Sequence, residues 1–521
     1  MPKSEQVPVV NRIGRLTRFG YVIDKKDLTT EQLKKIRDDL IVKPFRMKQY
    51  DFGNDNMFPV YHENADLIKI PKYYGIEKFG QPKVNALEET EYETINIEYK
   101  GLLRPRQEVI TSNVYKGMDT GRGGLLLAGC GTGKTNMGIH AIARYKVPTL
   151  IIVHKSFLMD QFIERLITFT NIKRSDIGIL QQKKEELDKP IVIAMIQSLL
   201  KKDLSDERYK RFGMVLIDEV HHMGARNFSK LFLKMTTKYM LGISAERQRA
   251  DGLYKIINWF MGPILHYEKQ PVNENVIVKR YFYKSLDANN CRVIHHKNIE
   301  DYNRSKMVTN LIDIDLRNKF IYRIILELFD QGKTILFLSG RLDHIMQIRK
   351  MLRKNEYLKG SYGLYLGGMK KEDLKKSSMK QIILASYEMA SEGLDIPGLN
   401  VVIFGTPKSN IRQSASRILR KEEYEEPPIM IDIIDDFTDY VKSQTDNIFV
   451  KQSKSREAYF TKQHYNIQDF LVTEKENHKT RQYCLDKDFI SESLKKPGDK
   501  SQKKTPVKTN KVDYSQVKFL D

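Results

Sequence analysis

The segment AGCGTGKT, from Ala128 to Thr135, combines glycines, a lysine and a threonine at a spacing that could hold a phosphate group. It follows the apolar run GGLLL and precedes NMGIHAIARY, so a strand, a glycine loop and a helix come in the required order. Glycines let backbone N–H groups turn toward phosphate oxygens, a lysine can reach the β- and γ-phosphates, and a threonine hydroxyl can bind Mg²⁺. The sequence therefore predicts a nucleotide site formed by Gly129, Gly131, Thr132, Gly133, Lys134 and Thr135.

Two neighbouring carboxylates could supply the other half of phosphoryl-transfer chemistry. The apolar run MVLI at 214–217 ends in Asp218 and Glu219, and carboxylates at this end of a parallel strand would face a nucleotide. One carboxylate can hold Mg²⁺ while the next orients and deprotonates the attacking water. We assign Asp218, together with Thr135, to the metal and Glu219 to the water. His221 is interpreted as a relay beside this water, because the spacing of the histidines does not indicate a zinc site.

The elements that must position these residues are strands alternating with helices. Apolar strand-like runs occur at GGLLLAG, TLIIVH, IVIAMIQ, MVLIDEV and YMLGIS, and a second set follows at TILFLSG, YGLYLGG, QIILAS, NVVIFG and PIMIDII. This alternation is typical of doubly wound parallel sheets, so the predicted fold class is α/β with two successive lobes. We expect a small α+β module at 1–100, a first lobe at 101–270, a second lobe at 305–460 and a basic, flexible tail at 471–521.

Composition narrows the class of partner. The chain has 521 residues, 40% of them hydrophobic and 30% charged, and a formal charge of +22. Such a cationic surface is attracted to phosphate backbones, which favours nucleic acid over the alternatives of a solubilising charge excess or an anionic membrane. No apolar run approaches the roughly 18 residues of a membrane span, and no secretory signal is visible. Three scattered cysteines indicate neither disulfides nor a zinc site, so we expect an intracellular protein that is not secreted.

With these motifs in place, the chain resembles the superfamily-two helicases from about residue 101 to 440. Besides the phosphate loop and the DEVH run, the resemblance rests on five segments: LRPRQ (103–107), TLIIVHKSFLMDQF (149–162), AMIQSL (194–199), ASYEMASEGLDIP (385–397) and QSASRILR (413–420). The resemblance implies two tandem RecA-like lobes that use ATP and Mg²⁺. It also implies hydrolysis in a cleft between the lobes, with a strand of nucleic acid as the track.

The same resemblance assigns roles to single residues. Gln107 would read the adenine edge, and Ser156 and Gln197 would contact nucleic acid. Gly393 and Asp395 would lie near the nucleotide. QSASRILR resembles the arginine-finger segment, in which Arg417 and Arg420 would share a helix face. The catalytic set implied in this way is Lys134, Asp218, Glu219, Gln413, Arg417 and Arg420.

Within the superfamily, the chain looks most like the DEVH-type branch. That branch holds promoter-opening transcription helicases, phage recombination helicases and transcript-release helicases of large cytoplasmic DNA viruses. DEVHH, the segment at 242–264 and the segment at 16–44 carry this likeness, which points to a large DNA virus and to host cytoplasm or virion. Two positions depart from the family. Glu246 and Arg247 stand where Ser-Ala-Thr-Pro would end, in the motif that couples hydrolysis to movement, and Ser416 replaces a glycine.

We therefore predict an ATP-dependent helicase or translocase that binds nucleic acid, with DNA favoured over RNA and transcription machinery as a further partner. Neither a membrane nor an oligomer is implied. Two alternatives stay open at this point. One is a nucleic-acid-binding remodeller with weak or uncoupled ATPase, favoured by Glu246 and Arg247. The other is the motor subunit of a restriction nuclease, although no compact nuclease signature is visible.

Overall fold

The computed structural model describes most of the chain between residues 13 and 486. The described ranges are 13–43, 57–129, 131–204, 206–223, 225–245, 254–268, 275–295, 302–392, 396, 398–419, 424–441, 446–477 and 480–486. The chain divides into two compact units, the first built mainly on residues up to Val272 and the second mainly on residues from Asn273 onward. Among the helices in these ranges, none is both long and apolar enough to cross a membrane.

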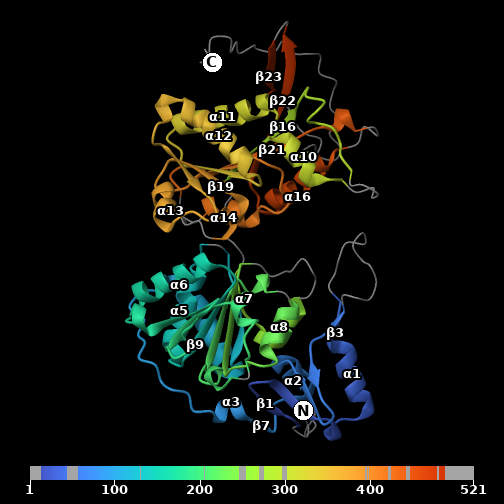
Figure 1. Ribbon diagram of the computed structural model, residues 1–521, viewed down its shortest axis with the longest axis vertical. Helices are drawn as coiled ribbons and strands as arrows, with labels where there is room; N and C mark the ends of the chain where they lie inside the picture. Colours follow the sequence, from blue (N-terminus) through green and yellow to red (C-terminus); the bar gives the residue numbers. More distant parts are fainter. Residues whose placement is uncertain are drawn as a thin grey trace, which may run out of the picture. The chain divides into compact units, whose positions relative to one another are not determined.

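The first unit is built on an eight-stranded sheet, as counted over the described residues, with strand order β11-β10-β12-β9-β13-β14-β8-β15. Its strands are β8 Gly123–Leu127, β9 Thr149–Val153, β10 Ile177–Gln181, β11 Lys184–Glu185, β12 Ile191–Met195, β13 Met214–Asp218, β14 Tyr239–Ser244 and β15 Ile264–Tyr267. All neighbouring pairs are parallel except β10 and β11. Its helices are α4 Pro105–Gly121, α5 Lys134–Tyr145, α6 Ser156–Phe169, α7 Ile196–Leu199, α8 Ala225–Phe232 and α9 Tyr254–Met261. Figure 1 shows this sheet at β9, with α5 and α6 on one side and α8 on the other.

Two hydrophobic cores explain why these strands are apolar throughout. Successive residues of a strand point to opposite faces, so Leu126 joins the core under α4, α5 and α6 while Leu125 joins the core under α8 and α9. A strand covered on both faces needs no polar alternation, which is why the continuous apolar runs predict it correctly.

The N-terminal residues form a small module that packs on this lobe. Its elements are β1 Arg15–Thr17, β2 Gly20–Asp24, α1 Thr30–Leu40, β3 Ile41–Val42, β4 Phe58–Pro59, β5 His62–Glu63, β6 Leu67–Ile70, α2 Lys72–Phe79, β7 Val84–Asn85 and α3 Ala86–Glu89. Its core continues into that of the lobe, and the rings of Tyr74 on α2 and Trp259 on α9 lie 5.4 Å apart. The module and the first lobe therefore share one core.

The second unit repeats the α/β design with strand order β18-β19-β17-β20-β21-β16-β22-β23, again counted over the described residues. Its strands are β16 Ile277–Lys284, β17 Ile335–Ser339, β18 Tyr362–Tyr365, β19 Ile382–Ser386, β20 Val401–Phe404, β21 Ile429–Asp435, β22 Asn466–Asn477 and β23 Thr480–Asp486. Its helices are α10 Arg304–Leu311, α11 Asp315–Asp330, α12 Leu342–Lys354, α13 Lys371–Ser378, α14 Tyr387–Glu392, α15 Arg412–Ala415 and α16 Ile448–Lys462. The predicted fold class, two tandem lobes with parallel sheets, is confirmed.

Two sequence-based boundaries differ from the structure. The second lobe was expected from residue 305, but β16 already belongs to its sheet. The basic tail was expected from residue 471, but β22 and β23 extend the same sheet through Asp486. Charged residues on β16 and β22 break the apolar pattern, and buried ion pairs make those charges compatible with a core.

Three buried arginines hold the second unit together through carboxylates. Arg280 on β16 donates from Nε and Nη2 to the two carboxylate oxygens of Asp469 on β22, at 2.7 and 2.6 Å. Arg317 on α11 makes the same forked contact with Asp435, and Arg456 on α16 donates to Asp432. Each of these arginine side chains is at most 2% exposed. Arg280 also pairs with Glu457 at 2.9 Å, so removing Asp469 would leave this buried cation with one carboxylate in place of two.

We predict that Asp469→Ala destabilises the second unit by about 3–5 kcal/mol, because Arg280 would lose its forked partner inside the sheet. The measurement is urea unfolding of the full chain followed by circular dichroism and by tryptophan fluorescence. Trp259 is the chain's one tryptophan and lies in the first unit, so its transition should stay in place while part of the dichroism transition moves to lower urea.

Asp439→Ala is the matched control, because its side chain is 71% exposed and its ion pair with Lys284 lies at the surface. Equal unfolding of both variants would show that the Arg280–Asp469 pair does not stabilise the sheet.

Candidate active site

The phosphate loop joins the end of β8 to the start of α5 and needs glycine at two described positions. Gly131 and Gly133 have φ values of +83° and +85°, in the left-handed region that favours glycine. A Cβ atom at Gly133 would also lie 2.2 Å from Nε2 of Gln107. The Thr132 hydroxyl donates to the carbonyl of Gly129 at 2.8 Å and closes the turn. The local geometry therefore fits a loop whose backbone faces a phosphate.

Lys134 begins α5 and is buried, with 8% of its surface exposed. Its Nζ donates to the carbonyl of Gly129 at 3.2 Å. An ammonium has three donors, so a phosphate oxygen can still be bound by this group. Thr135 follows at the first turn of α5 and is half-buried. The lysine, the hydroxyl and the loop suit a nucleotide phosphate with a divalent cation.

Asp218 and Glu219 lie at the carboxyl end of β13, which is the edge that the sequence predicts for them. Asp218 is 7% exposed, and burial together with the charge of Glu219 raises its pKa. Burial acts in the same sense on Glu219, but the charge of Lys134, helped by a hydrogen bond from the Ala245 N–H, holds the pKa of Glu219 below its ordinary value. Lys134 therefore interacts electrostatically with both carboxylates, and Glu219 is ionised at neutral pH.

His221 connects Glu219 to the end of β14. Its Nδ1 lies 2.7 Å from the Ser244 hydroxyl and 3.4 Å from Oε2 of Glu219, and the Ala245 N–H donates to that same carboxylate oxygen at 3.3 Å. Burial lowers the pKa of His221 to about 4, so the ring is neutral at physiological pH. The Ala245 N–H thus contacts Glu219 directly and the Ser244 hydroxyl contacts His221 beside it, whereas Glu246 and Arg247 lie outside the described residues.

Gln107 lies beside the phosphate loop, but its amide is already bonded within the protein. Its Nε2 donates to the carbonyl of Thr132 at 2.8 Å, and its Oε1 accepts from the Arg104 N–H at 2.9 Å. Arg104 adds bonds to the carbonyls of Gly131 and Thr132 at 3.2 and 3.1 Å. Both side chains hold the loop in shape. Adenine contact by Gln107 stays a prediction, and it would compete with these bonds.

The two residues expected to contact nucleic acid in the first lobe lie close together. Ser156 begins α6 after β9, and Gln197 lies on α7 after β12, the strand next to β9. Gln197 Nε2 donates to the carbonyl of His154 at 3.2 Å, two residues before Ser156. Both side chains are exposed at the carboxyl edge of the sheet.

The expected site residues of the second lobe are only partly described. Gly393, Asp395 and Arg420 lie outside the described residues, as does Cys130 of the phosphate loop, and the side chain of Gln413 is not described either. Arg417 is half-buried in a 3₁₀ turn, because the helix α15 ends at Ala415. The expectation of one continuous helix face for Arg417 and Arg420 is therefore not met up to Leu419.

Sequence reasoning missed a cavity in the second lobe. It has a volume of about 330 Å³ and lies at the carboxyl ends of β17, β19 and β20. Arg341 and Lys408 line it, and Lys408 Nζ lies 4.7 Å from the ring centre of Tyr387. The Thr406 hydroxyl accepts from the Gly340 N–H at 2.8 Å and joins two of the strand ends. A usable signal was present, because the apolar runs ILFLS and VVIF are each followed within a few residues by a cation. In the described part of the chain, no cluster of three or more His, Cys, Asp or Glu residues could hold a metal ion.

Comparison with known proteins agrees with this geometry. Residues 100–249 match the family described as "Type III restriction enzyme, res subunit", and residues 317–422 match "Helicase conserved C-terminal domain". The two matches fall on the two lobes and include the phosphate loop, the DEVH run and all of QSASRILR.

Among curated proteins, the chain is 49% identical to a protein of Acanthamoeba polyphaga mimivirus named as an ATP-dependent RNA helicase, L396, over 95% of this chain and 94% of the relative. It is 26% identical to helicase D10 of Escherichia phage T5, over 58% of this chain and 66% of the relative. It is 23% identical to the transcription and DNA repair factor IIH helicase/translocase subunit XPB of Schizosaccharomyces pombe, over 47% of this chain and 33% of the relative. The chain therefore belongs to the superfamily-two helicases, in the DEVH-type branch, and is an ATP-dependent helicase.

Proposed function

We propose that this helicase hydrolyses ATP with Mg²⁺ at the phosphate loop and uses the reaction to move along a strand of nucleic acid. One observation carries the proposal: Lys134, Asp218 and Glu219 are largely buried and act on one another electrostatically at one edge of the first sheet. Buried charges are costly to maintain, and a cation beside two carboxylates is the set that phosphoryl transfer requires.

Each residue of this set has a distinct proposed task. Lys134 and the loop N–H groups bind the phosphates, while Thr135 and Asp218 hold the cation. Mg²⁺, when bound, supplies positive charge against the phosphate oxygens. Glu219, whose lowered pKa keeps it ionised and able to accept a hydrogen bond, orients the attacking water and accepts its proton. Neutral His221 links Glu219 to Ser244 at the end of β14. Movement of that strand end would therefore shift Glu219 and the attacking water that it orients.

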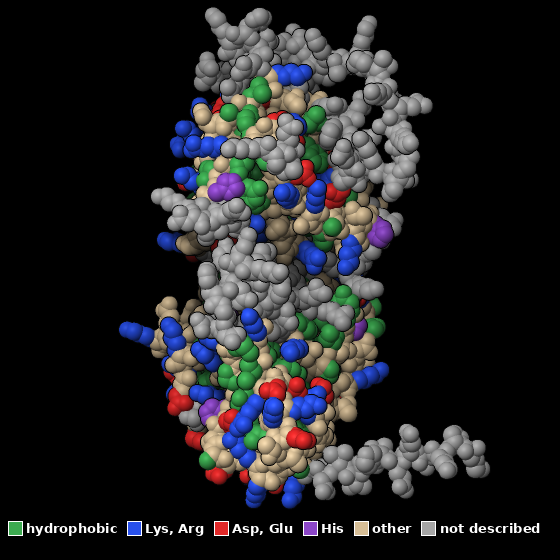
Figure 2. All heavy atoms as spheres, turned by 90° about the vertical axis from the view of Figure 1, so that its right-hand side faces the viewer, with side chains coloured by type: hydrophobic (Ala, Val, Ile, Leu, Met, Phe, Trp, Pro, Cys, Tyr) green, Lys and Arg blue, Asp and Glu red, His purple; other side chains and the backbone are tan. Residues whose placement is uncertain are grey.

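The track is proposed to contact the carboxyl edges of both sheets. Ser156 and Gln197 are our candidates in the first lobe. In the second lobe, Arg341 and Lys408 line a cavity at the strand ends, where open α/β sheets bind ligands. Lys and Arg side chains are scattered over the face of each unit seen in Figure 2, so general phosphate attraction is spread out and these two cations supply a local contact.

The names of the relatives support nucleic acid as the substrate, but they differ on whether it is RNA or DNA. The mimivirus relative is named as an RNA helicase, whereas the XPB relative is named for transcription and DNA repair. We propose that the protein acts on the nucleic acid of a large DNA virus and that transcription machinery is one of its partners. The match to a restriction-enzyme subunit covers the ATPase lobe, and Mg²⁺-dependent cleavage of duplex DNA by the purified protein would support the nuclease-motor alternative.

We predict that ATP turnover requires Mg²⁺, rises when nucleic acid is added, and falls to background in Lys134→Ala. The measurement is steady-state phosphate release with matched single- and double-stranded DNA and RNA of one sequence, and the strand that stimulates most identifies the track. Lys201→Ala, an exposed lysine in the same unit, is the control and should behave as wild type. Absence of turnover with every polynucleotide would favour the remodeller with an uncoupled ATPase.

A second prediction concerns the cavity of the second lobe. Lys408→Ala should weaken binding of every strand tested to a similar degree and lower the slope of log affinity against log salt by about 0.7 for single strands. Fluorescence anisotropy between about 50 and 200 mM salt measures both quantities. Lys359→Ala, whose side chain is 83% exposed on another part of the second unit, should leave the slope unchanged. Equal slopes in the two variants would show that Lys408 does not contact the nucleic-acid strand.

A third prediction follows from the resemblance of QSASRILR to an arginine-finger segment. Arg417→Ala and Arg420→Ala should bind ATP nearly as well as wild type, while hydrolysis falls by about 10³–10⁵, the range that a guanidinium donor supplies in related reactions. Single-turnover hydrolysis and nucleotide affinity are compared in the same variant. Arg412→Ala is the control, because Arg412 is exposed and lies 5.8 Å from the ring of Tyr459. Wild-type hydrolysis in Arg420→Ala would contradict the assignment.

A further inference from the structure

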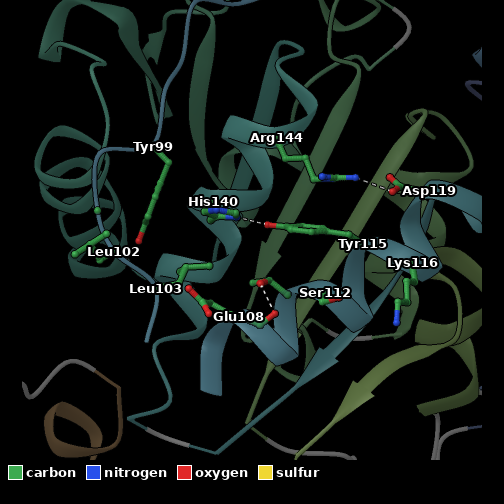
Figure 3. A pocket seen from close by; sticks show the side chains of 12 residues that line it. Tyr99, Leu102, Leu103, Glu108, Ser112, Tyr115, Lys116, Asp119, His140 and Arg144 are labelled. Atoms are coloured by element: carbon green, nitrogen blue, oxygen red, sulfur yellow. Dashed lines mark hydrogen bonds and ion pairs between the residues drawn. The ribbon is translucent and has the colours of Figure 1, made fainter. Parts of the chain in front are cut away.

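The first lobe contains a cavity that its proposed nucleotide chemistry does not use. The cavity has a volume of about 530 Å³ and lies between α4, α5 and the segment at 99–103 (Figure 3). Its lining includes neither the phosphate loop nor Gln107, Asp218 or Glu219. It is therefore separate from the nucleotide residues, although it lies between the two helices that carry several of them.

Aromatic rings form much of the cavity wall. In Figure 3, Tyr99 lies on one side, with its hydroxyl toward Leu103, and His140 and Tyr115 lie beside one another across the space. The Tyr115 hydroxyl is hydrogen-bonded to Nδ1 of His140, and the rings of Tyr99 and His140 are 4.8 Å apart. Burial lowers the pKa of His140 and raises that of Tyr115, so this wall carries no charge at neutral pH. A flat, uncharged ring suits such a wall.

Polar groups at the edges could read such a ring. The hydroxyl oxygen of Tyr99 is buried and has no hydrogen-bond partner among the described residues. Gly101 lets this tyrosine lie close to the backbone, since a Cβ there would be 2.9 Å from the same hydroxyl. Glu108 and Ser112 add a carboxylate and a hydroxyl to the lining. The exposed Ser112 hydroxyl and the Glu108 carboxylate are therefore the polar groups of this lining that can meet the edge of a bound ring.

Cations lie at the α4 and α5 side of the cavity. Arg144 pairs with Asp119 at 2.8 Å, and its guanidinium lies 4.7 Å from the ring centre of Tyr115. Lys116, one turn before Asp119 on α4, is exposed. A ring with an attached phosphate would place its neutral part on the aromatic wall and its charge near these side chains.

The geometry points to a second ligand site in the first lobe, which binds a nucleobase carried by a nucleoside phosphate or by the end of a strand. Stacking on an aromatic side chain contributes about 1–3 kcal/mol per base, and every base has a π face to offer. This inference does not depend on hydrolysis, because the cavity is complete within the first unit.

A ligand bound at this site would change the conformation of the phosphate loop. The Thr111 hydroxyl, in the cavity lining, donates to the carbonyl of Gln107 at 2.9 Å, and Leu103 directly precedes Arg104. Gln107 and Arg104 in turn hold the carbonyls of the loop. A ligand that fixes α4 against the 99–103 segment would therefore stabilise one loop conformation and alter nucleotide affinity.

The test uses full-length protein with its nucleotide site saturated by ADP and Mg²⁺. Each of the four nucleoside 5′-monophosphates is added separately, and binding is followed by saturation-transfer NMR. We expect at least one monophosphate to bind. Ser112→Trp, which fills the cavity from α4 and blocks stacking on its wall, should weaken it about tenfold or more. Thr120→Trp, exposed on the same helix and outside the lining, is the matched control and should bind as wild type.

Competition then identifies the source of the base. Displacement of the bound monophosphate by a single-stranded oligonucleotide assigns the site to a strand, and no displacement assigns it to free nucleotides. Lys134→Ala protein should still bind the monophosphate, which separates this site from the proposed ATPase. The inference is overturned if no monophosphate binds beside ADP, or if Ser112→Trp, folded by circular dichroism, binds it as tightly as wild type.

Discussion

The attraction between Lys134 and the Asp218–Glu219 pair is the interaction on which the first lobe depends. Three ionisable groups lie in a largely buried place, where burial raises the pKa of Asp218 and the neighbouring cation keeps Glu219 ionised. Such a group is tolerated only when rigid elements hold the charges in register. β8 and β13 provide that rigidity, since β14 lies between them and pairs in parallel with both. The apolar faces of the sheet, the two cores and the N-terminal module all stabilise this one edge.

The contacts of Glu219 involve the part of the coupling motif that comes just before the unusual residues Glu246 and Arg247. Ser244 and Ala245, the two residues that keep the family pattern, are the ones whose hydroxyl and N–H reach His221 and Glu219. Glu246 and Arg247 follow after these contacts have been made. The residues that keep the family pattern are thus the ones that contact His221 and Glu219, and in this motif the sequence departs from the family only from Glu246 onward.

Sequence reasoning succeeded where one residue type has one physical use. Strands buried on both faces are apolar throughout, so the apolar runs predicted the fold class, and Gly133 has a positive φ and no room for a side chain, as a tight glycine loop requires. It failed where polar residues are buried with partners distant in the chain. β16 and β22 were missed because Arg280 and Asp469 look like surface residues until they are paired across 189 positions. The hydrogen bond from Gln107 to the carbonyl of Thr132 was missed for the same reason, since a sequence pattern identifies the glutamine but not the carbonyl that it binds.

The two lobes use buried charge in opposite ways, and this contrast separates structural residues from reactive ones. In the second lobe, Arg280 and Arg317 each direct two nitrogens to both oxygens of one carboxylate, so their charge is paired and contributes rigidity. In the first lobe, Lys134 donates to a backbone carbonyl, and an oxygen of Asp218 accepts a backbone N–H. Backbone dipoles fix the direction of these side chains without neutralising them. Their charge stays available to a phosphate and its cation, which is the arrangement that a reaction centre needs and a purely structural ion pair does not provide.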